Sequence, residues 1–200
     1  VVMIVEKLLQ KRKSNPFKPG IKVNVYRDYE YRALVHAIRD RRIDSVETVM
    51  IGDSYFMTHM GRSSTRLSQQ DTLFAIEELP RLIREVRGEI DRDPSGTERP
   101  LLMADVPDGL DEPQMADIIG RFGAAGADII KLEVVIEADL WPLPLIHAQG
   151  LLSAVHLGYS PQKNENMVYG QTAADIQVFL ALLERVRREG AELVIFERLA

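Results

Sequence analysis

LLMADV, residues 101–106, consists of four successive apolar residues followed by Asp105 and Val106. A strand with one face in water alternates apolar and polar residues, whereas a strand covered on both faces is apolar at successive positions. The runs ADIIKLE (127–133) and AELVIFE (191–197) have the same character and also end in an acidic residue. We therefore expect a buried, parallel sheet in an α/β protein.

Short apolar runs alternate with longer segments of helical period along the whole chain, a pattern typical of βα units. Strands are expected at 21–26, 46–51, 101–106, 127–133, 151–157 and 191–197. Helices are expected at 29–41, 68–86, 111–123, 141–150 and 172–188. The segment between 51 and 68 has no clear period and is expected to be irregular. Pro80 is expected to kink or split the helix that contains it.

Six such units without a GxGxxG turn favour a (β/α)₈ TIM barrel over a dinucleotide-binding sheet. A complete barrel usually needs about 250 residues, whereas this chain has 200 and ends just after the sixth predicted strand. Three explanations stay open: the last two βα units are lacking in this chain, they come from elsewhere, or the sheet is open. Residues 21–200 are expected to form the barrel domain, and residues 1–20 an N-terminal helical extension.

Composition excludes several classes of protein. The net charge of −5 argues against a nucleic-acid partner, which would need clustered Lys and Arg. The absence of Cys excludes disulfides, thiolate metal sites and a Cys nucleophile, and fits a cytoplasmic location. The apolar start, VVMIVEKLLQ, is interrupted well short of the roughly 18 residues that a membrane span needs. We expect no membrane association.

Ionisable or hydroxyl side chains follow five of the predicted strands. They are Asp53 with Ser54, Asp105, Lys131 with Glu133, His156, and Glu197. The carboxyl ends of parallel strands share the face of an α/β fold where ligands bind. We therefore expect these side chains to meet at one site.

Three of these residues are candidate metal ligands. Asp53, Asp105 and Glu133 would repel one another unless a cation lay between them. Carboxylate oxygens, with no Cys and one nearby His, favour Mg²⁺ over zinc. Taken singly, each acid is better explained as a helix N-cap or a surface charge, and it is their joint placement at the strand ends that favours a metal site.

A magnesium ion at this place could polarise a small 2-keto acid, whose neighbouring carbon then loses a proton. Glu197 is the candidate general base, although it could instead pair with Arg198. Ser54 and Lys131 are candidates for binding the substrate carboxylate. His156 is a candidate partner for the keto acid or the product hydroxyl, or simply a core histidine.

The segments around these residues resemble, in order, the motifs of the ketopantoate hydroxymethyltransferase (3-methyl-2-oxobutanoate hydroxymethyltransferase) family. They are IGDSYFMTHMGRSST (51–65), LLMADVP (101–107), GADIIKLE (126–133), VHLGYSPQ (155–162) and EGAELVIFE (189–197). One fragment such as IGDS would be weak support, but five in register make a specific match that extends over residues 21–197.

The resemblance implies a (β/α)₈ barrel of the phosphoenolpyruvate/pyruvate superfamily that assembles as a homodecamer. It implies Mg²⁺-dependent, aldol-type transfer of a hydroxymethyl group from 5,10-methylenetetrahydrofolate to 2-oxoisovalerate, a step toward pantothenate and coenzyme A. The family's roles fall on the residues already named: Asp53 and Asp105 as metal ligands, Glu133 as a third acid near the metal, and Glu197 as the base. Ser54, Lys131 and His156 match substrate contacts.

The chain departs from the family pattern at several places. Val134 and Val135 replace two glycines and are expected to narrow the approach to the site. Arg62 and Ser63 stand where the family has His and Asp, and the end of the first strand, residues 24–28, is altered. The family's last two strands are absent. Two alternatives therefore stay open: a lyase or mutase of the isocitrate lyase type, and a catalytically silent homologue.

Overall fold

The computed structural model describes residues 22–25, 27, 29–33, 48–62, 68–92, 100–158 and 170–197. The predicted N-terminal extension, with its expected amphipathic helix, lies outside these residues. So does most of the predicted helix at 29–41, although residues 29–33 are helical as expected.

Six parallel strands form one sheet in the order in which they occur in the chain. Their bounds are β1 Lys22–Asn24, β2 Thr48–Ile51, β3 Leu101–Asp105, β4 Ile129–Val134, β5 Leu152–Gly158 and β6 Leu193–Glu197. Four lie within the predicted ranges, and β4 and β5 each end one residue later than predicted. A doubly wound sheet reverses its strand order at a switch point, whereas here each strand is added on the same side of the previous one. This sequential order is that of a TIM barrel wall.

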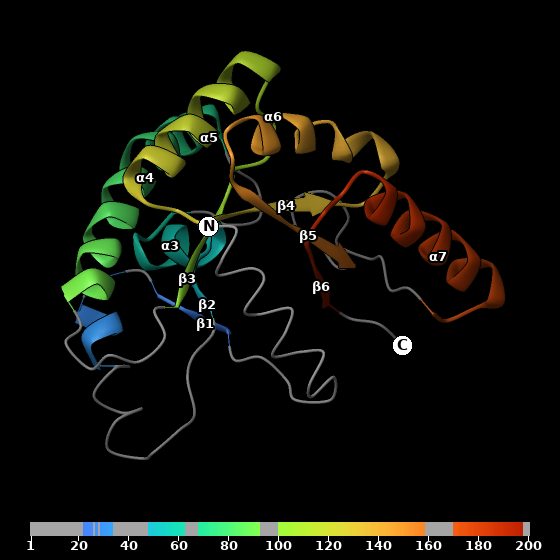
Figure 1. Ribbon diagram of the computed structural model, residues 1–200, viewed down its shortest axis with the longest axis horizontal. Coiled ribbons are helices and arrows are strands. Elements are labelled where there is room, and N and C mark those ends of the chain that lie inside the picture. The colour runs from blue at the N-terminus through green and yellow to red at the C-terminus, as the bar shows by residue number, and fades with distance from the viewer. Residues whose placement is uncertain are drawn as a thin grey trace.

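The helices lie on the outside of the curved sheet. Their bounds are α3 Asp53–His59, α4 Gln69–Arg92, α5 Glu112–Ala125, the 3₁₀ helix η1 Glu137–Leu140, α6 Leu143–Ala148 and α7 Ala173–Arg188. In Figure 1, α4, α5, α6 and α7 follow one another in an arc around the strands. The described part of the chain is therefore a barrel segment with a helical outer layer and a strand inner layer.

Successive residues of each strand face opposite sides of the sheet and enter two separate cores. The outer core lies between the sheet and the helices and includes Val49, Leu102, Ile130 and Val155. The inner core is smaller and consists of Met50, Leu101, Met103, Ile129 and Ala154. Burial on both faces is the reason that the strands read as continuous apolar runs.

Two expectations about helices were wrong. The stretch after β2 is not irregular throughout, because α3 begins directly at Asp53. Helix α4 is also not split at Pro80, since it continues from Gln69 to Arg92. A proline within a helix removes one backbone hydrogen bond, and Pro80 is buried together with Leu79, Leu82 and Ile83 on the packed face of the helix. Tertiary packing therefore outweighs the local cost.

The expected helix starts are confirmed. The Ser68 hydroxyl accepts from the Asp71 amide at 3.2 Å, and the Asp71 carboxylate accepts from the Ser68 amide at 3.2 Å. Asp111 is the N-cap of α5, where its carboxylate accepts from the Gln114 amide. Each such cap satisfies backbone donors that the first helical turn leaves without a partner.

Acidic residues just before two strands tie neighbouring strands together at the end opposite the predicted site. Asp128, in the sequence GAD before β4, accepts from the Leu102 amide of β3 at 2.8 Å. Glu192, in the matching sequence GAE before β6, accepts from the amide and the hydroxyl of Ser153 in β5. These carboxylates are structural, because each extends the sheet hydrogen bonding beyond the strand itself.

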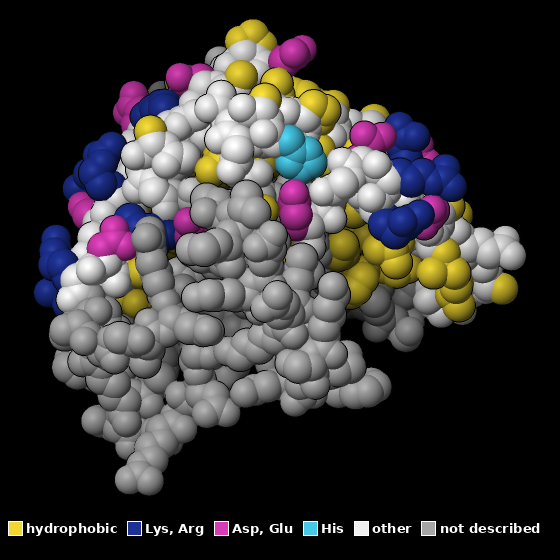
Figure 2. Space-filling model, viewed as in Figure 1, with side chains coloured by type: hydrophobic (Ala, Val, Ile, Leu, Met, Phe, Trp, Pro, Cys, Tyr) yellow, Lys and Arg dark blue, Asp and Glu magenta, His cyan; other side chains and the backbone are white. Residues whose placement is uncertain are grey.

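Helix α7 carries exposed apolar side chains in its first half. Ile176, Val178 and Leu180 are exposed there, and Phe196 is exposed on the adjacent β6. Figure 2 shows hydrophobic side chains gathered along the lower side of this helix. No helix within the described residues is both long enough and apolar enough to span a bilayer.

Candidate active site

Five of the predicted residues lie on the inner face of the sheet at the carboxyl ends of four strands: Asp105, Lys131, Glu133, His156 and Glu197. We call them the inner polar cluster. Below them the same face is apolar, since Met103 and Ile129 precede Asp105 and Lys131 by two residues in β3 and β4. Because side chains on one face recur every second residue, the inner face of β3 and β4 changes from an apolar layer to a polar layer toward the carboxyl ends of the strands.

Strand register brings the cluster residues opposite one another. Asp105 pairs with Lys131 between β3 and β4. Glu133 pairs with His156 between β4 and β5, and Gly158 pairs with Glu197 between β5 and β6. Each strand is offset from the last, so the polar residues rise along the curved sheet and form one continuous row.

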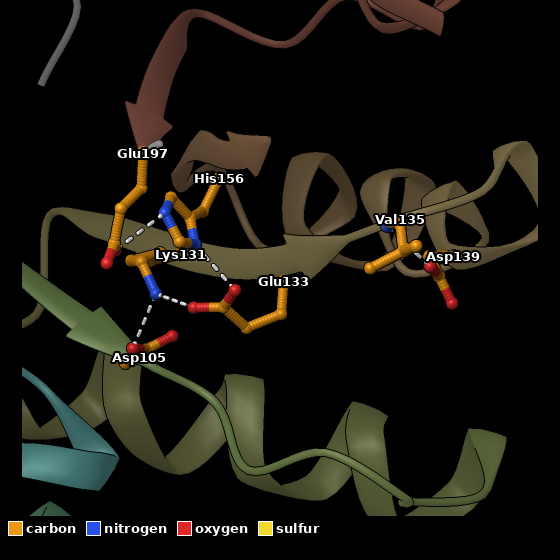
Figure 3. Close-up of polar contacts among 7 residues, drawn as sticks. All are labelled: Asp105, Lys131, Glu133, Val135, Asp139, His156 and Glu197. Atoms are coloured by element: carbon orange, nitrogen blue, oxygen red, sulfur yellow. Dashed lines mark hydrogen bonds and ion pairs between the residues drawn. The ribbon is translucent and has the colours of Figure 1, made fainter. Parts of the chain in front are cut away.

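The Lys131 ammonium lies at the centre of the first half of the row. It donates to Asp105 Oδ2 at 2.7 Å and also to Glu133 Oε1. Figure 3 shows the amine pointing between the two carboxylates. Lys131 and Asp105 are buried, and the Glu133 side chain is 11% exposed. Two carboxylates from neighbouring strands therefore already share one cation.

The charge states of this group follow from its contacts. Burial opposes the charged form of Lys131, but the Asp105 and Glu133 carboxylates outweigh it and raise the pKa of the ammonium above its ordinary value. Burial would likewise raise the pKa of Glu133, yet the His156 hydrogen bond and the Lys131 charge lower that pKa to about 2. The site thus contains a fixed ammonium and an ionised Glu133 at neutral pH.

His156 connects Glu133 to the rim of the site. Its Nδ1 donates to Glu133 Oε2 at 2.5 Å, and its Nε2 lies 3.3 Å from Glu197 Oε2 (Figure 3). The imidazole is 6% exposed, whereas the Glu197 side chain is 52% exposed. Glu197 is consequently the member of the cluster that a ligand can reach from solvent. The buried His156 contacts its carboxylate from the interior of the protein.

The predicted residues Asp53 and Ser54 are placed only by their backbone. They form the first turn of α3 directly after β2, whose last residue, Ile51, pairs with Ala104. They therefore begin at the same edge of the sheet as Asp105, but their side chains lie outside the described residues. Among the side chains that are described, no group of three or more His, Cys, Asp or Glu could hold a metal ion. The three-carboxylate metal site stays a prediction.

Two of the three proposed ligands nevertheless fit a hard cation. Asp105 and Glu133 contribute oxygen atoms from neighbouring strands, and those oxygens contact a single positive charge, the Lys131 ammonium. Oxygen donors that already converge on one cation suit Mg²⁺ better than a softer metal. The donor chemistry of the cluster is therefore compatible with the predicted ion.

The valines that replace the family's glycines do not both face the site. Val134 is 1% exposed and belongs to the outer core, so the expectation that it narrows the approach was wrong. The amides of Val135 and Ile136 both donate to Asp139 Oδ2, at 2.7 and 3.0 Å. Figure 3 places this pair away from the cluster. Asp139 was not identified from the sequence. An acidic residue three positions after Ile136, within the first turn of η1, could have indicated that it caps the backbone amides before that helix.

Arg62, at a position where the sequence motif it resembles has a histidine, has a structural role. Its guanidinium pairs with Asp71 at 2.9 Å and lies 4.0 Å from the centre of the Phe74 ring. Phe74 in turn stacks on Phe56 of α3, with ring centroids 6.0 Å apart. Arg62 therefore joins the segment after α3 to the start of α4 through an ion pair and a cation–π contact. Ser63 lies outside the described residues.

Gly158 allows β5 and β6 to approach each other beside Glu197. Its φ is +123°, and a Cβ at this position would lie 2.0 Å from the Glu197 carbonyl oxygen. We expect Gly158→Ala to lower the free energy of unfolding by about 2–3 kcal/mol, through backbone strain and overpacking at an edge strand. Urea denaturation measures the loss.

The control for this variant is Gly150→Ala. Gly150 also has a positive φ, of +69°, but a Cβ there would meet no atom within 4 Å. It should cost about 1 kcal/mol, the strain of the left-handed conformation alone. Equal losses in the two variants would contradict the close approach of the strands.

Comparisons with known proteins concern the fold. No protein-family model and no curated protein matches this chain. Among solved structures, a phosphonopyruvate hydrolase in complex with oxalate and Mg²⁺ is similar, with a TM-score of 0.64 and 9% identity over 97% of this chain and 62% of that one. The structure of 2,3-dimethylmalate lyase, a PEP mutase/isocitrate lyase superfamily member, gives 0.61 and 13% identity over 96% of this chain and 63% of that one. A protein assigned as a phosphonomutase, from Burkholderia cenocepacia J2315, gives a TM-score of 0.63 and 14% identity over 91% of this chain and 70% of that one.

Identities this low establish the fold alone. The chain has the parallel α/β, TIM-barrel-type architecture seen in structures of the PEP mutase/isocitrate lyase superfamily, and at this level the predicted fold is confirmed. The chain spans less than two thirds of the length of the hydrolase and the lyase. The comparisons do not show ketopantoate hydroxymethyltransferase itself, so that resemblance rests on the sequence motifs.

Proposed function

We propose that this protein is a Mg²⁺-dependent enzyme that removes a proton from the carbon next to the keto group of a small 2-keto acid. The observation that carries the proposal is that Asp105 and Glu133 converge on one positive charge, the Lys131 ammonium, close to the exposed carboxylate of Glu197. The fold is shared with a phosphonopyruvate hydrolase solved with Mg²⁺ and oxalate, which supports the choice of ion.

In this proposal Asp105, Glu133 and Asp53 hold the ion. Bound Mg²⁺ supplies a Lewis acid for the oxygen atoms of the 2-keto acid. Lys131 and Ser54 bind the substrate carboxylate, since an ammonium and a hydroxyl are suitable donors to it.

Glu197 is the proposed general base. It is the most exposed member of the inner polar cluster, and its carboxylate can accept a proton from a substrate carbon at the mouth of the barrel. The Nδ1–H of His156 donates to Glu133, and its Nε2 lies 3.3 Å from Glu197 Oε2, so a doubly protonated imidazole would also donate to Glu197 and orient it. In place of that contact, Nε2 can hydrogen-bond the keto acid or the product hydroxyl.

The finer proposal is transfer of a hydroxymethyl group from 5,10-methylenetetrahydrofolate to 2-oxoisovalerate, giving ketopantoate. It is supported by the five motifs in register. A second candidate, a 2-keto acid lyase or mutase of the isocitrate lyase type, is favoured by the likeness to dimethylmalate lyase. In both cases we propose that the six strands and their helices belong to a (β/α)₈ barrel, as the sequential strand order supports. Homo-oligomer assembly stays a prediction.

Proton exchange tests the proposal. Incubation with 2-oxoisovalerate in deuterated water is expected to give Mg²⁺-dependent loss of the C3 proton signal in NMR, and EDTA should abolish it. Formation of ketopantoate only with the folate supports the transferase. Release of a smaller keto acid from a 2-hydroxy or 2-keto diacid without folate supports the lyase. No exchange with any small 2-keto acid would favour a catalytically silent homologue.

A further inference from the structure

The Lys131 ammonium occupies the position between the two carboxylates that the proposed function gives to a metal ion. It donates to Asp105 and to Glu133, and the side chains of the three residues are 6%, 5% and 11% exposed respectively. When a carboxylate oxygen coordinates a divalent ion, its ion pair with the ammonium becomes weaker, because the two cations repel each other. The lysine and the metal therefore compete for the same anions.

Displacement of Lys131 from these carboxylates would leave a buried ammonium without compensation. Such a charge is costly unless a new anion approaches it. Every 2-keto acid carries a carboxylate, and the proposed function already directs that carboxylate to this side of the site. The substrate carboxylate can thus replace Asp105 and Glu133 as the counter-ion of the Lys131 ammonium when the metal binds those two residues.

We propose that Lys131 couples metal binding to substrate binding: the ammonium holds Asp105 and Glu133 while the site is empty, and the carboxylate of the 2-keto acid becomes its counter-ion once a divalent cation takes them. This inference rests on the proposed function. It makes the empty site a poor metal site and the substrate a requirement for tight metal binding. By linkage, the metal strengthens substrate binding by the same factor.

The test is the affinity for Mn²⁺, a paramagnetic substitute for Mg²⁺, measured from the free-ion signal in electron paramagnetic resonance. Wild-type protein is compared with Lys131→Met, with and without saturating 2-oxoisovalerate. Loss of the competing ammonium is expected to tighten Mn²⁺ binding in the absence of the keto acid by about 10-fold. The keto acid should strengthen Mn²⁺ binding at least about 10-fold in the wild type and much less in the variant.

Two further variants control for folding and charge. Lys131→Gln keeps a hydrogen-bond donor for the carboxylates without the charge. If Lys131→Met fails to fold, Lys131→Gln takes its place and should show the same tighter Mn²⁺ binding. Lys131→Arg keeps the charge and should retain weak Mn²⁺ binding without the keto acid.

Unchanged or weaker Mn²⁺ binding in the uncharged variants, with the effect of the keto acid preserved, would overturn the coupling and leave the metal proposal intact. No Mn²⁺ binding by any variant, with or without the keto acid, would overturn the proposed function and the coupling with it.

Discussion

Glu197→Gln is expected to slow the Mg²⁺-dependent exchange of the C3 proton of 2-oxoisovalerate by about 10²- to 10⁴-fold. The substitution keeps the size of the side chain and its place at the end of β6, but an amide cannot accept the proton. Because Glu197 is half exposed, the fold should tolerate the change. The measurement is the rate of signal loss by NMR in deuterated water, with circular dichroism as the folding check.

Glu189→Gln is the matched control for Glu197→Gln. It makes the same chemical change at the end of α7, where Glu189 forms a surface ion pair with Arg185, and it should leave the exchange rate unchanged. An exchange rate that survives Glu197→Gln would contradict the assignment of the base. If that rate were instead lost in His156→Gln, the base would be the imidazole.

Asp128→Ala is expected to lower the free energy of unfolding by about 3 kcal/mol, because it breaks a largely buried ion pair and leaves the Arg87 guanidinium with the more distant, half-exposed Asp91 carboxylate. The Arg87 guanidinium of α4 donates to Asp128 and, at 2.9 Å, to the Gly126 carbonyl. The two side chains are 8% and 13% exposed. The Leu102 amide would lose its acceptor as well. Urea denaturation, followed by circular dichroism, gives the change in stability.

A double-mutant cycle separates the charge from the packing at this site. Arg87→Met removes the guanidinium and keeps an apolar stem of similar length. Combined with Asp128→Ala, it should cost clearly less than the sum of the two single changes, since each single change leaves one member of the pair without its nearest counter-ion and the double change does not. A loss within about 0.5 kcal/mol for Asp128→Ala would contradict a structural ion pair.

Most of the fold could be predicted because its signals are local. Successive apolar residues marked the strands, and Ser68, Asp111 and Thr172 marked helix starts that the structure confirms. The errors arose where packing outweighs local preference. Pro80 stays inside α4 because its face of the helix is buried, and α3 forms in a segment too short to have a clear hydrophobic period.

The site was predicted as a set of strand ends, and the structure does gather five of the residues on one face. Their contacts could not be predicted. Nothing in the sequence indicates that Lys131 donates to Asp105, 26 residues away, instead of standing apart as a substrate group. Likewise, the outward orientation of Val134 depends on which strand face became the outer core.

The sequence by itself determined the six strands with the helices between them, the acidic and basic residues at the strand ends, and the caps, because each depends on residues a few positions apart. The tertiary structure alone decided that the strands pair in sequential order, that Lys131 lies between two carboxylates, and that His156 joins Glu133 to Glu197. The physical reason is register: a shift of one residue between neighbouring strands would send each of these side chains to the opposite face of the sheet.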